Sequence, residues 1–159
     1  MTGSIPVEVG HLTALVHISL FENVLSGPIP EELWELTPLE SLLLRTNQLT
    51  GTISDAIGQL TALTQVTFDT NQLTGTLPST VGQMVSIQQL ELQDNNLEGS
   101  LPVEVSQYKR LDILFLQNNL LTGPLDDRFN HSAQLQLTTI DMSNNRLSGS
   151  LPLEMFLLP

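Results

Sequence analysis

Apolar residues recur along the chain with a period of 24 residues. In residues 84–107 they occupy positions one, four, seven, nine, fourteen, eighteen and twenty-two of the unit. Neither a helical period nor strict alternation fits the whole unit, but alternation around positions six to nine predicts a short strand. A turn and a return segment are expected to complete the unit, and the fixed period indicates a repeat architecture.

The pattern starts again in successive stretches, so residues 1–159 are expected to form a single array. Residues 1–11 are the second half of a repeat, and further repeats begin near residues 12, 36, 60, 84, 108 and 134, the last after a two-residue insertion. Because one unit cannot bury its own apolar edge, stability is expected to come from the stacking of neighbouring units.

Equal spacing places each predicted strand beside the strand of the preceding unit, in a parallel ladder. Short helical or 3-10 turns are expected after the proline that recurs at position nineteen, near residues 31–35, 55–59, 79–83 and 103–107. The predicted fold class is an α/β repeat. About six 24-residue repeats would build a curved solenoid, with a parallel concave β-sheet and short 3-10 or helical segments on the convex side.

Two recurring residues are expected to have structural roles. Asparagine at position twelve follows the predicted strand, where its amide can satisfy turn amides and carbonyls of its own and the adjacent coil. This asparagine ladder comprises Asn23, Asn47, Asn71, Asn95, Asn119 and Asn145. Glycine at position sixteen, from Gly3 to Gly149, lacks a Cβ and so permits a bend or a close contact between coils.

Composition narrows the classes of partner. Seventeen acidic residues against five basic ones give a formal net charge of −12, which repels phosphate backbones, so no nucleic acid partner is expected. The chain has no cysteine and therefore no disulfide or thiolate metal site. No signal peptide is visible in the first residues, and no stretch approaches the ~20 apolar residues of a membrane span, so this segment is not expected to contact a membrane.

No enzymatic site is predicted. His11, His17 and His131 fall at different repeat positions or in the insertion, so no two of them form a metal-binding pair. Asp126 and Asp127 are adjacent, and side chains of adjacent residues diverge. Since nothing brings a nucleophile, a base and an oxyanion donor together, no catalytic residue, metal or cofactor is expected.

The full repeat reads L-x-x-L-x-x-L-x-L-x-x-N-x-L-x-G-x-I-P, and residues 60–83, LTALTQVTFDTNQLTGTLPSTVGQ, carry nearly all of it. This string resembles the plant-type leucine-rich repeat over essentially the whole chain. The family includes ectodomains of receptor-like kinases and receptor-like proteins, and secreted inhibitors of cell-wall polygalacturonases. The resemblance implies a non-catalytic binding module that is extracellular or at the cell surface, most simply part of a receptor ectodomain.

The chain departs from this family at its ends. Family ectodomains usually carry capping segments with paired cysteines, whereas this chain has no cysteine and both ends stop inside a repeat. We therefore expect an uncapped fragment of a longer protein. Bare coil ends expose apolar edges, so end-to-end self-association is also expected.

Positions six, eight, ten and eleven face outward from the predicted strand and form the candidate ligand-binding surface. Folding does not require apolar residues there, so Phe21, Leu43, Ile113 and Phe115 are candidate anchors. The resemblance implies a protein, peptide or glycan ligand on this concave face. The candidate binding residues are His17, Phe21, Leu43, Arg45, Thr67, Asp69, Glu91, Gln93, Ile113, Phe115, Gln117 and Asp141.

The alternative to a receptor ectodomain is a stand-alone secreted protein, similar either to polygalacturonase inhibitors or to ice-binding proteins. Hydroxyl residues flank the recurring glycine, as Thr74 and Thr76 do, and such rows resemble the surface of ice-binding leucine-rich repeat proteins. Pro28, Glu98 and Pro124 interrupt the rows. Serine and threonine also suit a second short strand, so the rows have a structural interpretation as well.

One glycosylation sequon is present, Asn130-His131-Ser132. It lies in the insertion before the last repeat, where a loop would accommodate a glycan. Asn130 is therefore a possible glycosylation site if the protein is secreted.

Overall fold

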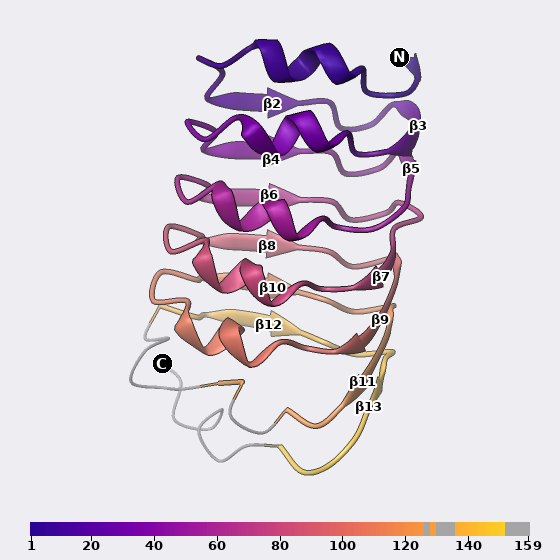
Figure 1. Cartoon of the computed structure of the whole chain (residues 1–159). Coiled ribbons are helices and arrows are strands. Elements are labelled where there is room, and N and C mark those ends of the chain that lie inside the picture. Colours follow the sequence, from indigo (N-terminus) through magenta and orange to yellow (C-terminus); the bar gives the residue numbers. More distant parts are fainter. Residues whose placement is uncertain (126–127, 130–135, 152–159) are drawn as a thin grey trace.

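The computed structural model describes residues 1–125, 128–129 and 136–151, and these form a stack of similar coils (Figure 1). Each full coil contributes a short strand to one parallel sheet of order β12-β10-β8-β6-β4-β2. The strands are β2 (His17–Ser19), β4 (Ser41–Leu43), β6 (Gln65–Thr67), β8 (Gln89–Glu91), β10 (Ile113–Phe115) and β12 (Thr139–Asp141). Each inner strand of this sheet pairs with those of the repeats before and after it, which confirms the predicted parallel ladder.

A second row of strands runs along one edge of the stack (Figure 1). One sheet contains β1 (Thr2–Gly3), β3 (Val24–Pro28) and β5 (Gln48–Thr50). The other contains β7 (Thr74–Thr76), β9 (Asn96–Ser100), β11 (Leu120–Gly123) and β13 (Arg146–Leu147). Five of the recurring glycines lie in these strands, and Gly51 and Gly149 follow strands β5 and β13. A single bridge between Thr52 and Thr74 lies between these two sheets. The second short strand suggested by the serine and threonine residues is therefore present.

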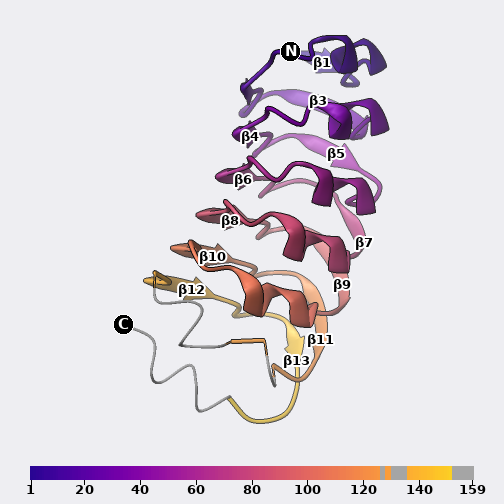
Figure 2. The ribbon, with the colours of Figure 1, turned by 60° about the vertical axis from the view of Figure 1, so that its left-hand side comes forward.

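Short 3-10 helices cover the side of the coils opposite the six-stranded sheet (Figures 1 and 2). They are η1 (Val7–His11), η2 (Glu31–Glu35), η3 (Asp55–Gln59), η4 (Ser79–Gln83) and η5 (Val103–Gln107). The last four coincide with the predicted turns, whereas η1 was not predicted. Proline precedes four of them in an extended conformation that leads into the helix, and before η3 Ser54 instead accepts a hydrogen bond from the Ala56 amide.

The hydrophobic core runs without a break through the stack, from Ile5 to Leu137. The middle residue of each strand points inward because side chains alternate along a strand. Leu42, Val66 and Leu114 are each fully buried in this way. The outer two residues of each three-residue strand point to the opposite side, which we call the concave face.

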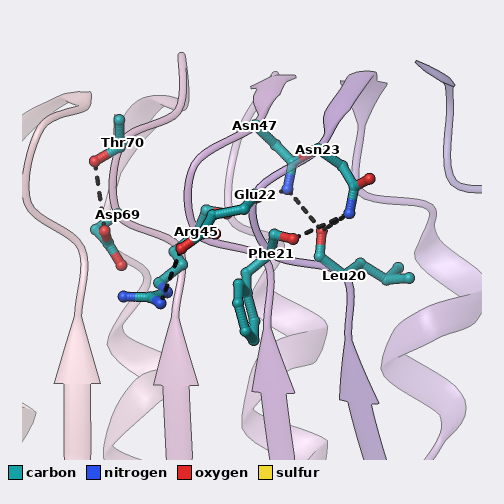
Figure 3. Close-up of polar contacts among 8 residues, drawn as sticks. All are labelled: Leu20, Phe21, Glu22, Asn23, Arg45, Asn47, Asp69 and Thr70. Atoms are coloured by element: carbon teal, nitrogen blue, oxygen red, sulfur yellow. Dashed lines mark hydrogen bonds and ion pairs between the residues drawn. The ribbon is translucent and has the colours of Figure 1, made fainter. Parts of the chain in front are cut away.

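The asparagine ladder was predicted correctly. The Nδ2 of Asn71 donates to the carbonyls of Leu44 (3.1 Å) and Phe68 (3.0 Å), and its Oδ1 accepts from the Leu49 amide (2.9 Å). Figure 3 shows the equivalent link from Asn47 to the Leu20 carbonyl of the preceding coil. Each asparagine thus ties its own turn to the previous repeat, at a point where the chain leaves the sheet.

The recurring glycine is required by both conformation and space. All seven of these glycines have φ between +74° and +92°, in the region that favours glycine. At Gly99 a Cβ would also lie 2.7 Å from Cγ2 of Thr76 in the preceding coil. Thr76, which follows the glycine of its own repeat, therefore lies against the glycine of the next coil.

Replacing Gly99 with alanine is expected to lower the free energy of unfolding by about 2 kcal/mol, from the positive φ together with the contact with Thr76. Thr76→Ser removes the methyl group that Cβ would meet. In a double-mutant cycle followed by urea denaturation, Gly99→Ala should therefore cost roughly 1 kcal/mol less in the Thr76→Ser protein. An equal cost in both backgrounds would show that the contact between coils contributes nothing.

Candidate functional site

The concave face holds the predicted binding residues, but only part of the set lies on strands. His17, Leu43, Thr67, Glu91, Ile113, Phe115 and Asp141 are on the six-stranded sheet, and Phe21, Arg45, Asp69, Gln93 and Gln117 follow its strands by two residues. Positions ten and eleven, interpreted from sequence as strand, belong to the turn. Position eleven has φ from 53° to 57° at Glu22, Thr46, Thr70, Asp94, Asn118 and Asn144. The chain turns there, so the strand interpretation was wrong at these positions.

Side chains of four successive coils surround a hollow of about 170 Å³ on the concave face, which we call the central hollow. It is lined by Phe21, Leu43, Arg45, Gln65, Thr67, Gln89 and Glu91. Five of these seven residues are among the predicted candidates, and Gln65 and Gln89 are the additions. An apolar wall, hydrogen-bonding groups and charges of both signs thus meet in one place.

Arg45 is held in position at one end of the central hollow. Its Nη2 pairs with Glu22 Oε1 at 3.2 Å, and its guanidinium carbon lies 4.7 Å from the centre of the Phe21 ring (Figure 3). An aromatic face attracts a cation, so Phe21 supports this arginine in addition to presenting apolar surface. Phe21 therefore has a contact within the protein as well as a surface that a ligand could use.

Two glutamines and a glutamate form a directed chain of hydrogen bonds along the hollow. Gln65 Nε2 donates to Gln89 Oε1 at 2.9 Å, and Gln89 Nε2 donates to Glu91 Oε1. Since a carboxylate only accepts, Gln89 has to turn its NH2 group toward Glu91, and this in turn fixes the orientation of Gln65. The donor groups of both glutamines thus point along the chain toward Glu91.

Thr67 and Asp69 are buried, although sequence predicted them as exposed. Thr67 is 4% exposed and Asp69 is 8% exposed. Thr67 is flanked in the sheet by the longer side chains of Leu43 and Glu91, which stand on either side of it. Burial, and then the nearby charge of Glu91, raise the pKa of Asp69. Neither Thr67 Oγ1 nor Asp69 Oδ1 has a hydrogen-bond partner within the part of the chain that the structure describes.

The remaining candidates lie around the hollow. Ile113 and Phe115 on β10 are both half-buried, so apolar surface is available to a ligand beside Glu91 on β8. His17, at the first strand of the sheet, is exposed. Asp141, at the last strand, accepts a hydrogen bond from the Ser143 amide at 2.9 Å, which lowers the pKa of this carboxyl.

A family model of the leucine-rich repeat matches residues 38–60 and 136–158. The leucine-rich repeat ectodomain of the Arabidopsis thaliana membrane receptor kinase GASSHO1/SCHENGEN3, solved with CASPARIAN STRIP INTEGRITY FACTOR 2, is 34% identical, with a TM-score of 0.92 over 97% of this chain and 18% of that one. The Arabidopsis receptor kinase HAESA, solved with the peptide hormone IDA and the co-receptor SERK1, is 29% identical, with a TM-score of 0.91. The match covers 98% of this chain and 26% of HAESA. A chain of the BIR3–SERK2 complex from Arabidopsis thaliana is 31% identical, with a TM-score of 0.68. The match covers 83% of this chain and 69% of that one.

This chain belongs to the leucine-rich repeat family. It spans about a quarter or less of the two receptor kinase ectodomains named first. No curated protein matches it. A plant ice-binding protein, which bears on the alternative function, is 25% identical, with a TM-score of 0.62 over 99% of this chain and 66% of that one.

Gln65, Gln89 and Glu22 were not among the residues predicted from the sequence for this leucine-rich repeat site, although their repeat positions could have indicated them. Gln65 and Gln89 occupy the same repeat position in successive repeats, and a parallel register places such residues side by side. Glu22 shares its position with the residues of positive φ, so its side chain leaves the turn where Arg45 can reach it. Asn130, His131, Asp126 and Asp127 lie outside the described residues.

The described residues of this leucine-rich repeat chain were searched for a membrane-spanning helix and for a metal site. None of their helices is long and apolar enough to cross a membrane. Among the same residues, no group of three or more histidine, cysteine, aspartate or glutamate side chains could hold a metal ion.

Proposed function

We propose that this chain is a non-catalytic recognition module, which binds a protein or peptide ligand across its concave face and forms part of an extracellular receptor ectodomain. The observation that carries the proposal is the combination on one face of half-exposed apolar residues, Ile113 and Phe115, with the polar central hollow beside them. Apolar anchors next to well-oriented polar groups are the usual composition of a binding surface.

The similar structures support this proposal. HAESA was solved with a peptide hormone and a co-receptor, and GASSHO1/SCHENGEN3 with CASPARIAN STRIP INTEGRITY FACTOR 2. Leucine-rich repeat ectodomains of this kind are typically not catalytic. By analogy, this chain would present its concave face outside the cell to an extended ligand, such as a peptide that lies across several strands.

The concave anchors can be tested with peptides selected from a phage-displayed library of random heptapeptides. Ile113→Ser and Phe115→Ser are each expected to weaken binding of a selected peptide by about 1 to 2 kcal/mol, because each removes apolar contact area at the ligand. Binding is measured by isothermal titration calorimetry, and circular dichroism is expected to show unchanged folding.

Val103→Ser is the matched control, because Val103 is an apolar residue on η5, is 45% exposed and lies on the opposite side of the coil. It should leave peptide binding unchanged. Equal weakening by Val103→Ser and Phe115→Ser would contradict the concave site. Unfolding of the Ile113→Ser or Phe115→Ser protein would instead show that these residues belong to the core.

Ice binding is the second candidate, favoured by the similarity to a plant ice-binding protein and by the threonines beside the recurring glycine. The geometry supports it less well. Thr76 packs against the next coil, Thr74 Oγ1 donates to the Gly51 carbonyl at 3.2 Å, and the second row of strands is divided between two sheets. Absence of thermal hysteresis and of ice recrystallisation inhibition would remove this candidate.

A further inference from the structure

We propose that the Glu91 end of the central hollow is a subsite for a basic side chain, lysine or arginine, of the peptide ligand. This inference rests on the proposed function and makes it more specific, since it names the chemistry that the ligand presents to β6 and β8. Three features of the described residues lead to it: the direction of a hydrogen-bond chain, an unpartnered buried hydroxyl and an excess of carboxylates.

The hydrogen-bond chain offers acceptors to a ligand. Because Gln65 and Gln89 both point their amide nitrogens toward Glu91, the groups with no hydrogen bond among the described residues are oxygens, namely Gln65 Oε1 and Glu91 Oε2. The carboxylate sets this polarity, so rotating the amides cannot reverse it without breaking the chain. Each glutamine NH2 keeps one further hydrogen, but the two atoms without any hydrogen bond are acceptors, so a donor group of a ligand finds two free oxygens here.

Thr67 supplies the second feature. It lines the hollow, is only 4% exposed, and its Oγ1 has no partner among the described residues. A buried hydroxyl without a hydrogen bond is unfavourable, and most such groups in proteins are satisfied. Thr67 stands opposite Glu91 in the register of β6 and β8, so one donor-rich group could reach both.

The local charge favours a cation. Around the hollow, the single guanidinium of Arg45 faces the three carboxylates of Glu22, Asp69 and Glu91, and Arg45 is paired with Glu22. Asp69 and Glu91 are close enough for one charge to raise the pKa of the other carboxyl. A cation placed between them would relieve this repulsion.

A long basic side chain also fits the shape of the hollow. Leu43 offers an apolar wall for the methylene groups of lysine or arginine, while the charged end reaches the carboxylates. Arg45 is on the coil of β4 and Glu91 is on β8, so about two strand spacings, roughly 10 Å, separate their backbones. Arg45 pairs with Glu22 and partly offsets the raised pKa of Asp69, so the resident cation serves the Asp69 side of the hollow and leaves the Glu91 end without a cation among the described residues.

The test uses the heptapeptides selected from the phage library, re-synthesised with each lysine or arginine replaced by norleucine, which keeps the methylene groups and removes the charge. Selection is expected to enrich basic residues. Norleucine replacement should weaken binding to the unmodified protein by about ten- to one-hundredfold, the range for hydrogen bonds to charged groups.

The same replacement should have little further effect on binding to the Glu91→Gln and Asp69→Asn proteins. In the Glu91→Gln protein the new amide oxygen can still accept from Gln89, so folding should persist, as circular dichroism can verify. Glu98→Gln is the matched control, because Glu98 is exposed on β9 in another sheet and its replacement changes the net charge equally. In that protein the full effect of norleucine should remain.

The outcomes separate this inference from the proposed function. If selected peptides bind and Phe115→Ser weakens them, but norleucine replacement acts equally in the Glu91→Gln and unmodified proteins, the basic subsite is wrong and the concave site stands. If no peptide is selected by the folded protein, both proposals fail. Equal effects of Glu91→Gln and Glu98→Gln would show attraction by net charge alone and would also overturn the subsite.

Discussion

Replacing Asn95 with alanine is expected to lower the free energy of unfolding by about 2 to 4 kcal/mol. Asn95 Oδ1 is the acceptor for the Leu73 amide at 2.9 Å, so alanine would leave that buried N–H without a partner. An unsatisfied buried group costs about 1 to 3 kcal/mol. The Phe68, Leu92 and Gln93 carbonyls would also each lose one hydrogen bond. Each keeps a second one, the first two from a neighbouring ladder asparagine and Gln93 from the Thr70 amide.

Two further variants make the Asn95 test specific. Asn145→Ala should cost less, because Asn145 is only half-buried and water can replace part of what it provides. Asn95→Asp keeps the acceptor for Leu73 but turns an oxygen toward three carbonyl oxygens, so it should be at least as destabilising as alanine. The free energy of unfolding of all three variants is measured by urea denaturation, with circular dichroism as the signal. A cost for Asn95→Ala no greater than that for Asn145→Ala would contradict the proposed role of the ladder.

The regular parts of this fold could be predicted because each repeat position meets the same neighbours in every coil. Asparagine at position twelve and proline at position nineteen recur, and the structure gives them the roles expected from their chemistry. The four predicted turns, such as 79–83, match the 3-10 helices residue for residue. A fixed period also sets the parallel register, since residue 66 pairs with residue 90, its equivalent in the next repeat.

Positions that vary between repeats were harder to interpret. The turn at position eleven has a positive φ, yet Glu22, Thr46 and Asn118 share no residue type that marks it. Burial of Thr67 depends on the length of the side chains on the neighbouring strands, which belong to other repeats. The candidate site was therefore predicted as a face, whereas the hollow and its chain of hydrogen bonds required the arrangement of particular side chains.

Trp34 is the clearest case of a residue whose role only the structure shows. It occupies the repeat position filled by Gly10, Gly58, Gly82 and Ser106 elsewhere. A Cβ at Gly58 or Gly82 would come within 2.6 Å of the next coil. Trp34 is nonetheless 1% exposed, and its ring centre lies 6.5 Å from that of Phe68, which replaces the leucine of most other repeats. Gly58 and Gly82 face the residue 22 positions further along the chain, and the same spacing from Trp34 leads to the small residue Ala56.

Comparison of the repeats alone would suggest that a small residue at position 34 restores the common pattern and stabilises the protein. The structure leads to the opposite expectation. Trp34→Ala should lower the free energy of unfolding by about 3 to 5 kcal/mol, because it leaves a cavity against Phe68 in the continuous core. Urea denaturation measures the loss.

Trp34→Phe is the matched control, since it keeps an aromatic ring and removes only part of the volume. The indole N–H of Trp34 has no hydrogen-bond partner among the described residues, so its loss should cost nothing in hydrogen bonding. Trp34→Phe should therefore be clearly less destabilising than Trp34→Ala. If Trp34→Ala were as stable as the unmodified protein, the coils would have closed over the space. In that case the regular spacing of the repeats, rather than the aromatic pair, would determine how these two coils pack.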